Sequence, residues 1–225
     1  MVETEKYVTV ILAKKPELGK VKSRIANVTS EDFALKLALA SIEDVTSNLR
    51  SNSYNLIVAT DALEDLRWFE ELHNLTGITI LPSKDKNLSY KMRFVFNSLL
   101  NEHRYKTAIL VPMDIPFLTS GELDFAFDKL RSNNYVLGPE NNGGVYLIGM
   151  NRNSFRTELF NNVAWSTPKS FATLIDNFQK EKTYVLELKD DLNTFQDVLN
   201  NLAPIQLLCP KVYLLLKNSF PKKSK

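Results

Sequence analysis

Short apolar runs alternate with longer amphipathic stretches along most of the chain. The apolar runs have the length of buried strands, and the longer stretches repeat their apolar residues with the period of a helix. The predicted strands are Val8–Ala13, Leu56–Thr60, Ile78–Leu81, Ala108–Pro112, Tyr135–Leu137, Val145–Gly149 and Tyr184–Leu188. The predicted helices are Ser30–Leu49, Leu63–Leu72, Leu88–Asn101, Ser120–Arg131, Pro168–Gln179 and Thr194–Leu202. This alternation predicts an α/β protein, a three-layer α/β/α sandwich around a mostly parallel sheet.

One connection breaks the alternation. The strand-like segments Tyr135–Pro139 and Val145–Gly149 are joined by Glu140-Asn141-Asn142-Gly143-Gly144. This segment is too short to contain a crossover helix, which a parallel connection requires. The sequence therefore predicts a short antiparallel excursion beside the parallel strands.

Length and composition indicate one domain that does not bind nucleic acid. The 225 residues are 44% hydrophobic and contain no Pro/Gly/Ser-rich linker, so we expect a single domain over residues 1–225, with a core from about 7 to 202 and a basic extension from 203 to 225. The 28 basic and 26 acidic residues nearly cancel. Residues 211–225 contain five lysines and no acid, which leaves 23 basic against 26 acidic residues, or −3, on the rest. A nucleic acid backbone would meet no broad cationic surface.

The cysteine content and the two ends of the chain suggest a cytoplasmic protein. The single Cys209 excludes an internal disulfide framework, and the polar Met1–Lys6 is unlike a secretory signal. Apolar runs such as Val212–Leu216 are much shorter than the roughly 20 residues of a transmembrane helix. The basic extension has two interpretations: a helix packed on the core with a frayed end, or a surface segment that contacts anionic lipid.

A basic loop follows the first predicted strand. Between Ala13 and Arg24 the chain contains four lysines, and Pro16 and Gly19 can bend it. Ligands of open α/β sheets bind beyond the carboxyl ends of the strands, so this loop is placed to hold a polyanion such as phosphate. A solvated basic turn is the alternative.

Three further loops also follow predicted strands. Asp114 comes after the fourth strand, Gly143-Gly144 after the fifth, and Asn193 after the seventh. Taken singly, each also has a purely structural interpretation. Asp114 can be a turn residue, Gly143-Gly144 can form a glycine turn, and Asn193 can cap a helix. Taken together, they are expected to open on the same edge of one sheet as the basic loop.

These motifs and their order resemble the glycosyltransferase-A-like nucleotide-diphospho-sugar transferases. That superfamily includes arsenosugar-type glycosyltransferases, 2-phospho-lactate guanylyltransferases and molybdenum-cofactor guanylyltransferases. The resemblance runs from about residue 7 to 200 and is carried by Ala13-Lys14-x-Pro16-x-x-Gly19-x-Val21-Lys22-Ser23-Arg24, Asn87-Leu88-Ser89-Tyr90-Lys91-Met92-Arg93, Met113-Asp114-Ile115-Pro116, Leu137-Gly138-Pro139-Glu140-x-Asn142-Gly143-Gly144-Val145-Tyr146-Leu147-Ile148-Gly149, Trp165-Ser166-Thr167 and Asp191-Leu192-Asn193-Thr194.

The resemblance implies a Rossmann-like nucleotide-binding fold and assigns roles to individual residues. Catalysis would involve Asp114, Lys22 and Arg24. A divalent ion, Mg²⁺ or Mn²⁺, would be held by Asp114 and Asn193. The nucleotide would contact Lys14, Gly19, Lys22, Ser23 and Arg24. The substrate pocket would be formed by Asn142, Gly143, Gly144 and Trp165, although Trp165 can also be interpreted as an ordinary aromatic residue of the core or its rim.

The chain departs from the family pattern at Ser89, at Pro112 and at three positions where Asn replaces Asp. Asn87, Asn142 and Asn193 stand where the family has Asp, and each replacement removes one negative charge. We expect a metal-assisted glycosyltransferase that uses a nucleotide-diphospho-sugar and a small acceptor. The alternatives are a guanylyltransferase-like nucleotidyltransferase, which would join an NTP to a phosphorylated acceptor, and a non-catalytic nucleotide-binding member.

Overall fold

The computed structural model describes residues 6–81 and 87–220. The contacts divide the chain into two compact units, which are described separately below. The sheet unit comprises Met1–Lys14, Ser51–Pro112 and Gly121–Lys189, and the helical unit comprises Lys15–Arg50, Met113–Ser120 and Asp190–Lys225.

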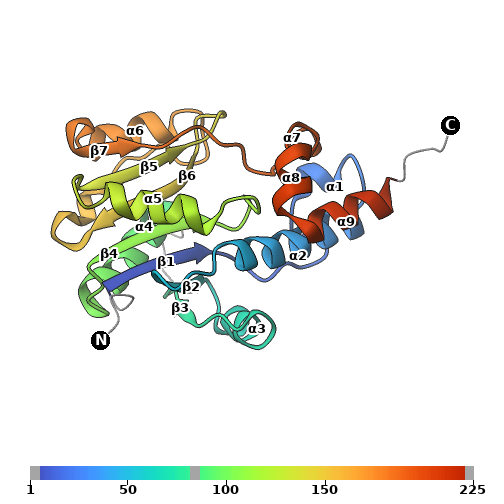
Figure 1. The fold of residues 1–225 in the computed structure, drawn as a ribbon, viewed down its shortest axis with the longest axis horizontal. Coiled ribbons are helices and arrows are strands. Elements are labelled where there is room, and N and C mark those ends of the chain that lie inside the picture. The colour runs from blue at the N-terminus through green and yellow to red at the C-terminus, as the bar shows by residue number, and fades with distance from the viewer. Residues whose placement is uncertain (1–5, 82–86, 221–225) are drawn as a thin grey trace. The chain divides into compact units, whose positions relative to one another are not determined.

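A seven-stranded sheet forms the centre of the sheet unit (Figure 1). Its strands lie in the order β3-β2-β1-β4-β6-β5-β7. They are β1 (Tyr7–Leu12), β2 (Asn55–Thr60), β3 (Gly77–Thr79), β4 (Thr107–Pro112), β5 (Tyr135–Pro139), β6 (Val145–Asn151) and β7 (Thr183–Val185). β1, β2, β3 and β4 are parallel, as expected for strands joined by crossover helices.

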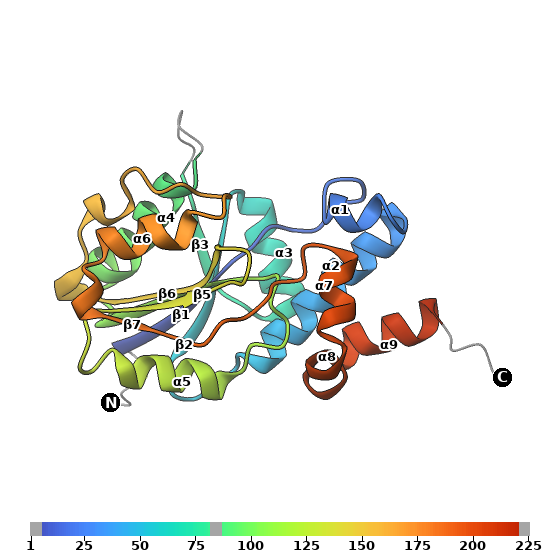
Figure 2. The same ribbon diagram turned by 90° about the horizontal axis from the view of Figure 1, so that it is seen from above.

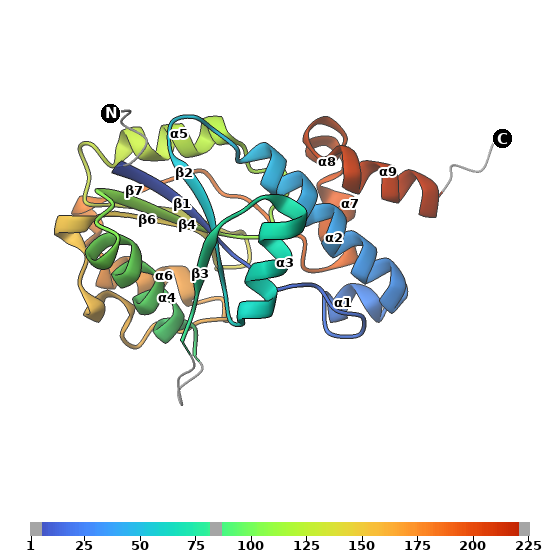
Figure 3. The same cartoon turned by 90° about the horizontal axis from the view of Figure 1, so that it is seen from below.

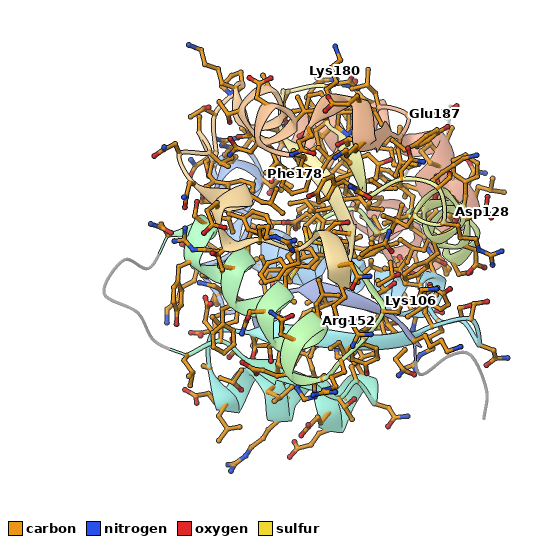
Figure 4. The ribbon with its side chains drawn as sticks, turned by 90° about the vertical axis from the view of Figure 1, so that its left-hand side faces the viewer. Lys106, Asp128, Arg152, Phe178, Lys180 and Glu187 are labelled. Atoms are coloured by element: carbon orange, nitrogen blue, oxygen red, sulfur yellow. The ribbon has the colours of Figure 1, made fainter. Side chains whose placement is uncertain are left out.

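The antiparallel excursion is confirmed. β6 runs against both of its neighbours, β4 and β5, whereas β5 and β7 are parallel. At the end of β6, the Arg152 amide donates to the Lys106 carbonyl oxygen over 2.9 Å. Lys106 precedes β4 and Arg152 follows β6, so this hydrogen bond joins the ends of the two strands; both residues are labelled in Figure 4.

Helices cover both faces of this sheet, so the predicted layered α/β architecture is confirmed. The helices of the unit are α3 (Leu63–His73), α4 (Leu88–Asn97), α5 (Ser120–Lys129) and α6 (Ser170–Asn177). α4 and α6 lie on one face and α5 on the other (Figures 2 and 3). On the α4–α6 face, Phe96, Leu99 and the fully buried Phe178 join one hydrophobic cluster with the central strands.

Several element ends differ from the expectation. The predicted helix Leu88–Asn101 stops being α-helical at Asn97 and continues as a π-helix, Ser98–Glu102, where the Glu102 carboxylate accepts from the Asn97 and Ser98 side chains at 3.0 Å. β7 ends at Val185, three residues before the predicted end. Short 3-10 helices, which the sequence did not predict, lie at Arg152–Ser154, Thr157–Phe160 and Lys180–Lys182.

The helical unit consists of one long helix and several short ones. They are α1 (Ser23–Ala26), α2 (Glu31–Asn48), α7 (Phe195–Asn200), α8 (Leu202–Leu208) and α9 (Pro210–Ser219). The expected start of α2 is confirmed, because the Ser30 hydroxyl accepts from the Phe33 amide at 3.1 Å. The basic extension is helical in α8 and α9, and its last residues, 221–225, lie outside the described residues. No helix among residues 6–81 and 87–220 is long and apolar enough to cross a membrane.

α9 is attached to α2 through a buried carboxylate. Asp44, which is 1% exposed, accepts from the backbone amides of Lys211 at 3.1 Å and Val212 at 2.9 Å. These amides belong to the first turn of α9, where backbone donors have no partner within the helix. Asp44 therefore caps a helix that lies more than 160 residues away in the sequence.

Replacing Asp44 with alanine should destabilise the protein by about 2–3 kcal/mol, because two buried amides lose a charged acceptor. Asp44→Asn should cost less, since its remaining carbonyl oxygen can still accept. Urea unfolding followed by circular dichroism would measure both changes. The matched control is Glu43→Ala, which removes only the exposed ion pair with Lys211 and should leave the midpoint unchanged. A loss as small for Asp44→Ala as for Glu43→Ala would contradict the capping role.

Candidate functional site

In the helical unit, the structure brings Lys22 and Asp114 into direct contact. The Lys22 ammonium donates to Asp114 Oδ1 at 2.6 Å and to the Leu192 carbonyl oxygen at 2.9 Å. The Lys22 side chain is only 4% exposed, compared with 32% for Asp114. Two predicted catalytic residues thus form a largely buried ion pair. Asp114 follows the last residue of β4, Pro112, by two positions.

Asp191 is a member of this site that the sequence analysis did not select. Burial raises its pKa to about 6, and the nearby carboxylates of Asp114 and Asp197 add to the rise. The Asn193 side-chain amide donates to the Asp191 carboxylate. Asp191 belongs to the Asp191-Leu192-Asn193-Thr194 motif, in which the family resemblance assigns the metal to Asn193 and no role to Asp191.

Asn193 does not cap the following helix, so that alternative is wrong. The N-cap of α7 is Thr194, whose hydroxyl accepts from the Asp197 amide at 3.2 Å. The Asp197 carboxylate in turn accepts from the backbone amides of Thr194 at 2.6 Å and Asn193 at 3.1 Å. This capping box fixes the backbone on which Asp191 and Asn193 lie.

The donors of this cluster fit a hard divalent cation only in part. The Asp114 and Asp191 carboxylates and the Asn193 amide oxygen are ligands of the type that Mg²⁺ and Mn²⁺ accept. A cation, the Lys22 ammonium, already contacts Asp114. Within the described residues, no group of three or more His, Cys, Asp or Glu side chains is arranged to hold a metal. A bound ion would therefore need further oxygens from a ligand such as phosphate.

The rest of the basic loop in this unit is accessible. Ser23 and Arg24 are exposed in α1, and Gly19 has a φ of +73°, a conformation that favours glycine. Lys20 forms an exposed ion pair with Glu17 at 2.6 Å. Unlike Lys22, the Arg24 guanidinium is therefore available to an incoming anion.

In the sheet unit, Lys14 belongs to a second charged group. The Lys14 and Lys91 ammonium groups lie 2.9 and 2.6 Å from the same oxygen, Asp61 Oδ2. Burial pushes the pKa of Asp61 upwards, but hydrogen bonds from Lys91 and Lys14 outweigh it and leave the pKa below its usual value. Asp61 directly follows β2 and was not selected from the sequence, because a single acid after a strand is a weak signal.

The Asn142–Gly144 turn in the sheet unit is fixed by its own hydrogen bonds. Asn142 Oδ1 accepts from the Gly144 amide at 2.7 Å, and the Gly143 amide donates to the Glu140 carbonyl oxygen at 3.0 Å. Gly143 has a φ of +84°, and a Cβ atom there would lie 2.1 Å from the Pro168 carbonyl oxygen. Gly143 is thus required by the turn itself, and Asn142 supports it.

Trp165 and Asn87 also have structural partners in the sheet unit. The Trp165 indole N–H donates to the Ser89 hydroxyl at 2.7 Å, and its half-buried ring packs against the hydrophobic cluster. Asn87 Oδ1 accepts from the Tyr90 amide at 2.8 Å and so caps α4. An amide serves as well as a carboxylate in this cap, so Asn87 does not weaken the helix start.

The fold is similar to that of nucleotide-diphospho-sugar transferases and nucleotidyltransferases. In particular, the chain belongs to the family described as "uncharacterized protein conserved in bacteria (DUF2064)", whose model matches residues 45–167, more than half of the chain. The 2-phospho-L-lactate guanylyltransferase of Methanobrevibacter smithii is 24% identical over 137 residues, which are 61% of this chain and 59% of that protein. The match thus spans less than two thirds of this relative's length.

Solved structures share the fold. A protein of Desulfovibrio desulfuricans G20, provisionally assigned as a nucleotide-diphospho-sugar transferase, superposes with a TM-score of 0.85 at 21% identity and covers 95% of each chain. A cytidylyltransferase of Leptospira borgpetersenii superposes with a TM-score of 0.56 at 12% identity, covering 95% of this chain and 94% of that one. The resemblance inferred from the motifs is therefore confirmed at the level of the fold.

Proposed function

We propose that this protein is a metal-assisted transferase that uses a nucleotide-diphospho-sugar as donor and transfers the sugar to a small acceptor. The observation that carries the proposal is the Lys22–Asp114 ion pair, a cation and a carboxylate held together at 2.6 Å beside the accessible Arg24. Sugar transfer from such a donor needs positive groups of this kind, because negative charge builds up on the departing diphosphate.

The proposal assigns distinct roles to the chain's own residues. Arg24 grips two phosphate oxygens through its planar guanidinium, and Lys14, Gly19, Lys22 and Ser23 make further contacts to the nucleotide. Asp114, with Asn193, holds Mg²⁺ or Mn²⁺ together with the donor's phosphates. When bound, the ion supplies positive charge that stabilises the leaving diphosphate. Asn142, Gly143, Gly144 and Trp165 shape the pocket for the sugar or the acceptor.

A second candidate is nucleotidyl transfer from an NTP to a phosphorylated acceptor, with release of pyrophosphate. The matching relative from Methanobrevibacter smithii, a guanylyltransferase, favours it. The same positive groups would then hold a triphosphate. The two candidates differ in the ligand that binds productively.

Thermal unfolding in the presence of ligands tests both candidates. Nucleotide-diphospho-sugars and NTPs with each base are compared, with and without Mn²⁺. A ligand at 100 times its Kd should stabilise the folded protein by about 2.7 kcal/mol, which is readily seen as a rise in Tm. A response to nucleotide-sugars supports glycosyl transfer, and a response to NTPs alone supports nucleotidyl transfer. No response to either class would contradict the proposed function.

Replacing Arg24 with alanine should weaken binding of the nucleotide found in this screen by about tenfold or more, because a charge-assisted contact to phosphate is lost. Arg24→Lys should recover only part of the affinity, since a point charge cannot reproduce the two-pronged contact. Titration calorimetry measures both. Lys20→Ala removes a charge from the same loop, where Lys20 pairs with Glu17, and serves as the control. Equal affinity in Arg24→Ala and the wild type would remove Arg24 from the phosphate site.

A further inference from the structure

Lys22 is held in an unusual way. Its backbone is left-handed, with φ 45° and ψ 48°, which is uncommon for a residue other than glycine. Its side chain is almost completely buried, yet the ammonium ends at Asp114 and the Leu192 carbonyl oxygen. Strained backbone persists where surrounding contacts enforce it, and such positions concentrate at functional sites. With this backbone conformation, the Lys22 ammonium lies at Asp114.

The charges around this ammonium are unbalanced. Asp114 is in contact with it, and the half-buried Asp191 lies close to both Asp114 and Asp197. The carboxylates of Asp114 and Asp197 repel that of Asp191, and the Lys22 ammonium attracts it.

We propose that Lys22 is the built-in counter-ion of Asp114, which suppresses metal binding to the empty protein until the donor's phosphates draw the ammonium away. This inference rests on the proposed function, because the phosphates of the nucleotide are what releases Lys22. A divalent ion and an ammonium at one carboxylate repel each other, so either cation weakens binding of the other. Nucleotide and metal must then bind with positive coupling, each raising the affinity of the other by the same factor.

The proposal gives Lys22 two alternative partners. In the empty protein its ammonium neutralises Asp114, which spares the site an uncompensated carboxylate. In the loaded protein the same ammonium faces phosphate, and Asp114 is free to accept the ion that arrives with the nucleotide. The exchange moves no proton and breaks no covalent bond. Its effect is to order the binding events, with the nucleotide favoured before or together with the metal.

Titration of Mn²⁺ into the full-length protein without nucleotide tests the counter-ion role directly. Lys22→Met removes the charge and keeps most of the side-chain length, and it should bind Mn²⁺ about ten times more tightly than the wild type or better. Lys20→Met, which causes the same change in net charge on the same loop, should bind as weakly as the wild type. Equal Mn²⁺ affinity in Lys22→Met and the wild type would overturn the proposal, as would equal gains in both variants.

A measurement on the wild-type protein decides the matter if Lys22→Met does not fold. Amine acetylation read by mass spectrometry should find Lys22 poorly reactive in the empty protein and more reactive when excess Mn²⁺ displaces its ammonium. Unchanged reactivity at saturating Mn²⁺ would overturn the proposal. Because neither experiment contains nucleotide, a failure here is distinct from a failure of the ligand screen, which tests the proposed function itself.

Discussion

Asp114→Asn should abolish metal-dependent turnover while the protein remains folded. The substitution removes the carboxylate that the proposed function assigns to the divalent ion. Mutating even the outer partners of metal ligands typically costs about 10- to 100-fold in affinity or activity, so loss of this carboxylate should reduce kcat/KM by at least about 100-fold. The measurement is turnover with the donor identified by the ligand screen, over a range of Mn²⁺ concentrations.

In the wild type, the Lys22 ammonium donates to Asp114 Oδ1. The fold should survive because the asparagine side chain keeps an oxygen that can accept this hydrogen bond. Circular dichroism and Tm confirm that the variant is folded. Asp32→Asn is the control, since Asp32 is an exposed acid of α2 that pairs with Lys36. Turnover of Asp114→Asn close to the wild-type rate would remove Asp114 from the metal site.

Gly143→Ala should destabilise the protein by about 2–5 kcal/mol. An alanine at φ +84° is strained, and its Cβ would lie 2.1 Å from the Pro168 carbonyl oxygen, a backbone atom that cannot move alone. Either the turn shifts or the segment around Pro168 does. Urea unfolding measures the loss, and crystallography of the variant would show which segment moves.

Gly121→Ala is the matched control. Gly121 lies in the first turn of α5, and a Cβ atom there meets nothing within 4 Å. Alanine favours the helix over glycine by up to about 1 kcal/mol, so this variant should be as stable as the wild type or slightly more stable. If Gly143→Ala behaved like Gly121→Ala, the Asn142–Gly144 turn would not depend on its glycines.

The strands and most helices could be predicted because their signals are local. The apolar runs of β1 and β4 are short and nearly continuous, as in strands buried on both faces, and the structure buries their central residues. The antiparallel excursion followed from a five-residue connection alone. Serine is a common N-cap residue, so the start of α2 could be predicted at Ser30, whose hydroxyl accepts from the Phe33 amide.

The partners of the candidate site residues could not be predicted, because they depend on contacts between distant segments. Lys22 and Asp114 are 92 positions apart, and nothing near either residue indicates that they pair. The sequence therefore suggested a free phosphate-binding lysine, whereas the structure shows a buried one. The charged neighbours of Asp61 and Asp191 could not be predicted either, because Lys91 and Asp114 lie in distant segments of the chain.

The attachment of α9 has a consequence for how the chain can vary. Asp44 binds main-chain amides, which every residue except proline provides, so the identities of Lys211 and Val212 matter little to this contact. Position 44, in contrast, needs a side chain whose acceptor oxygens reach the amides of residues 211 and 212. Substitutions should therefore be tolerated at 211 far more readily than at 44, and a proline at either 211 or 212 should be the change that this helix cannot accept.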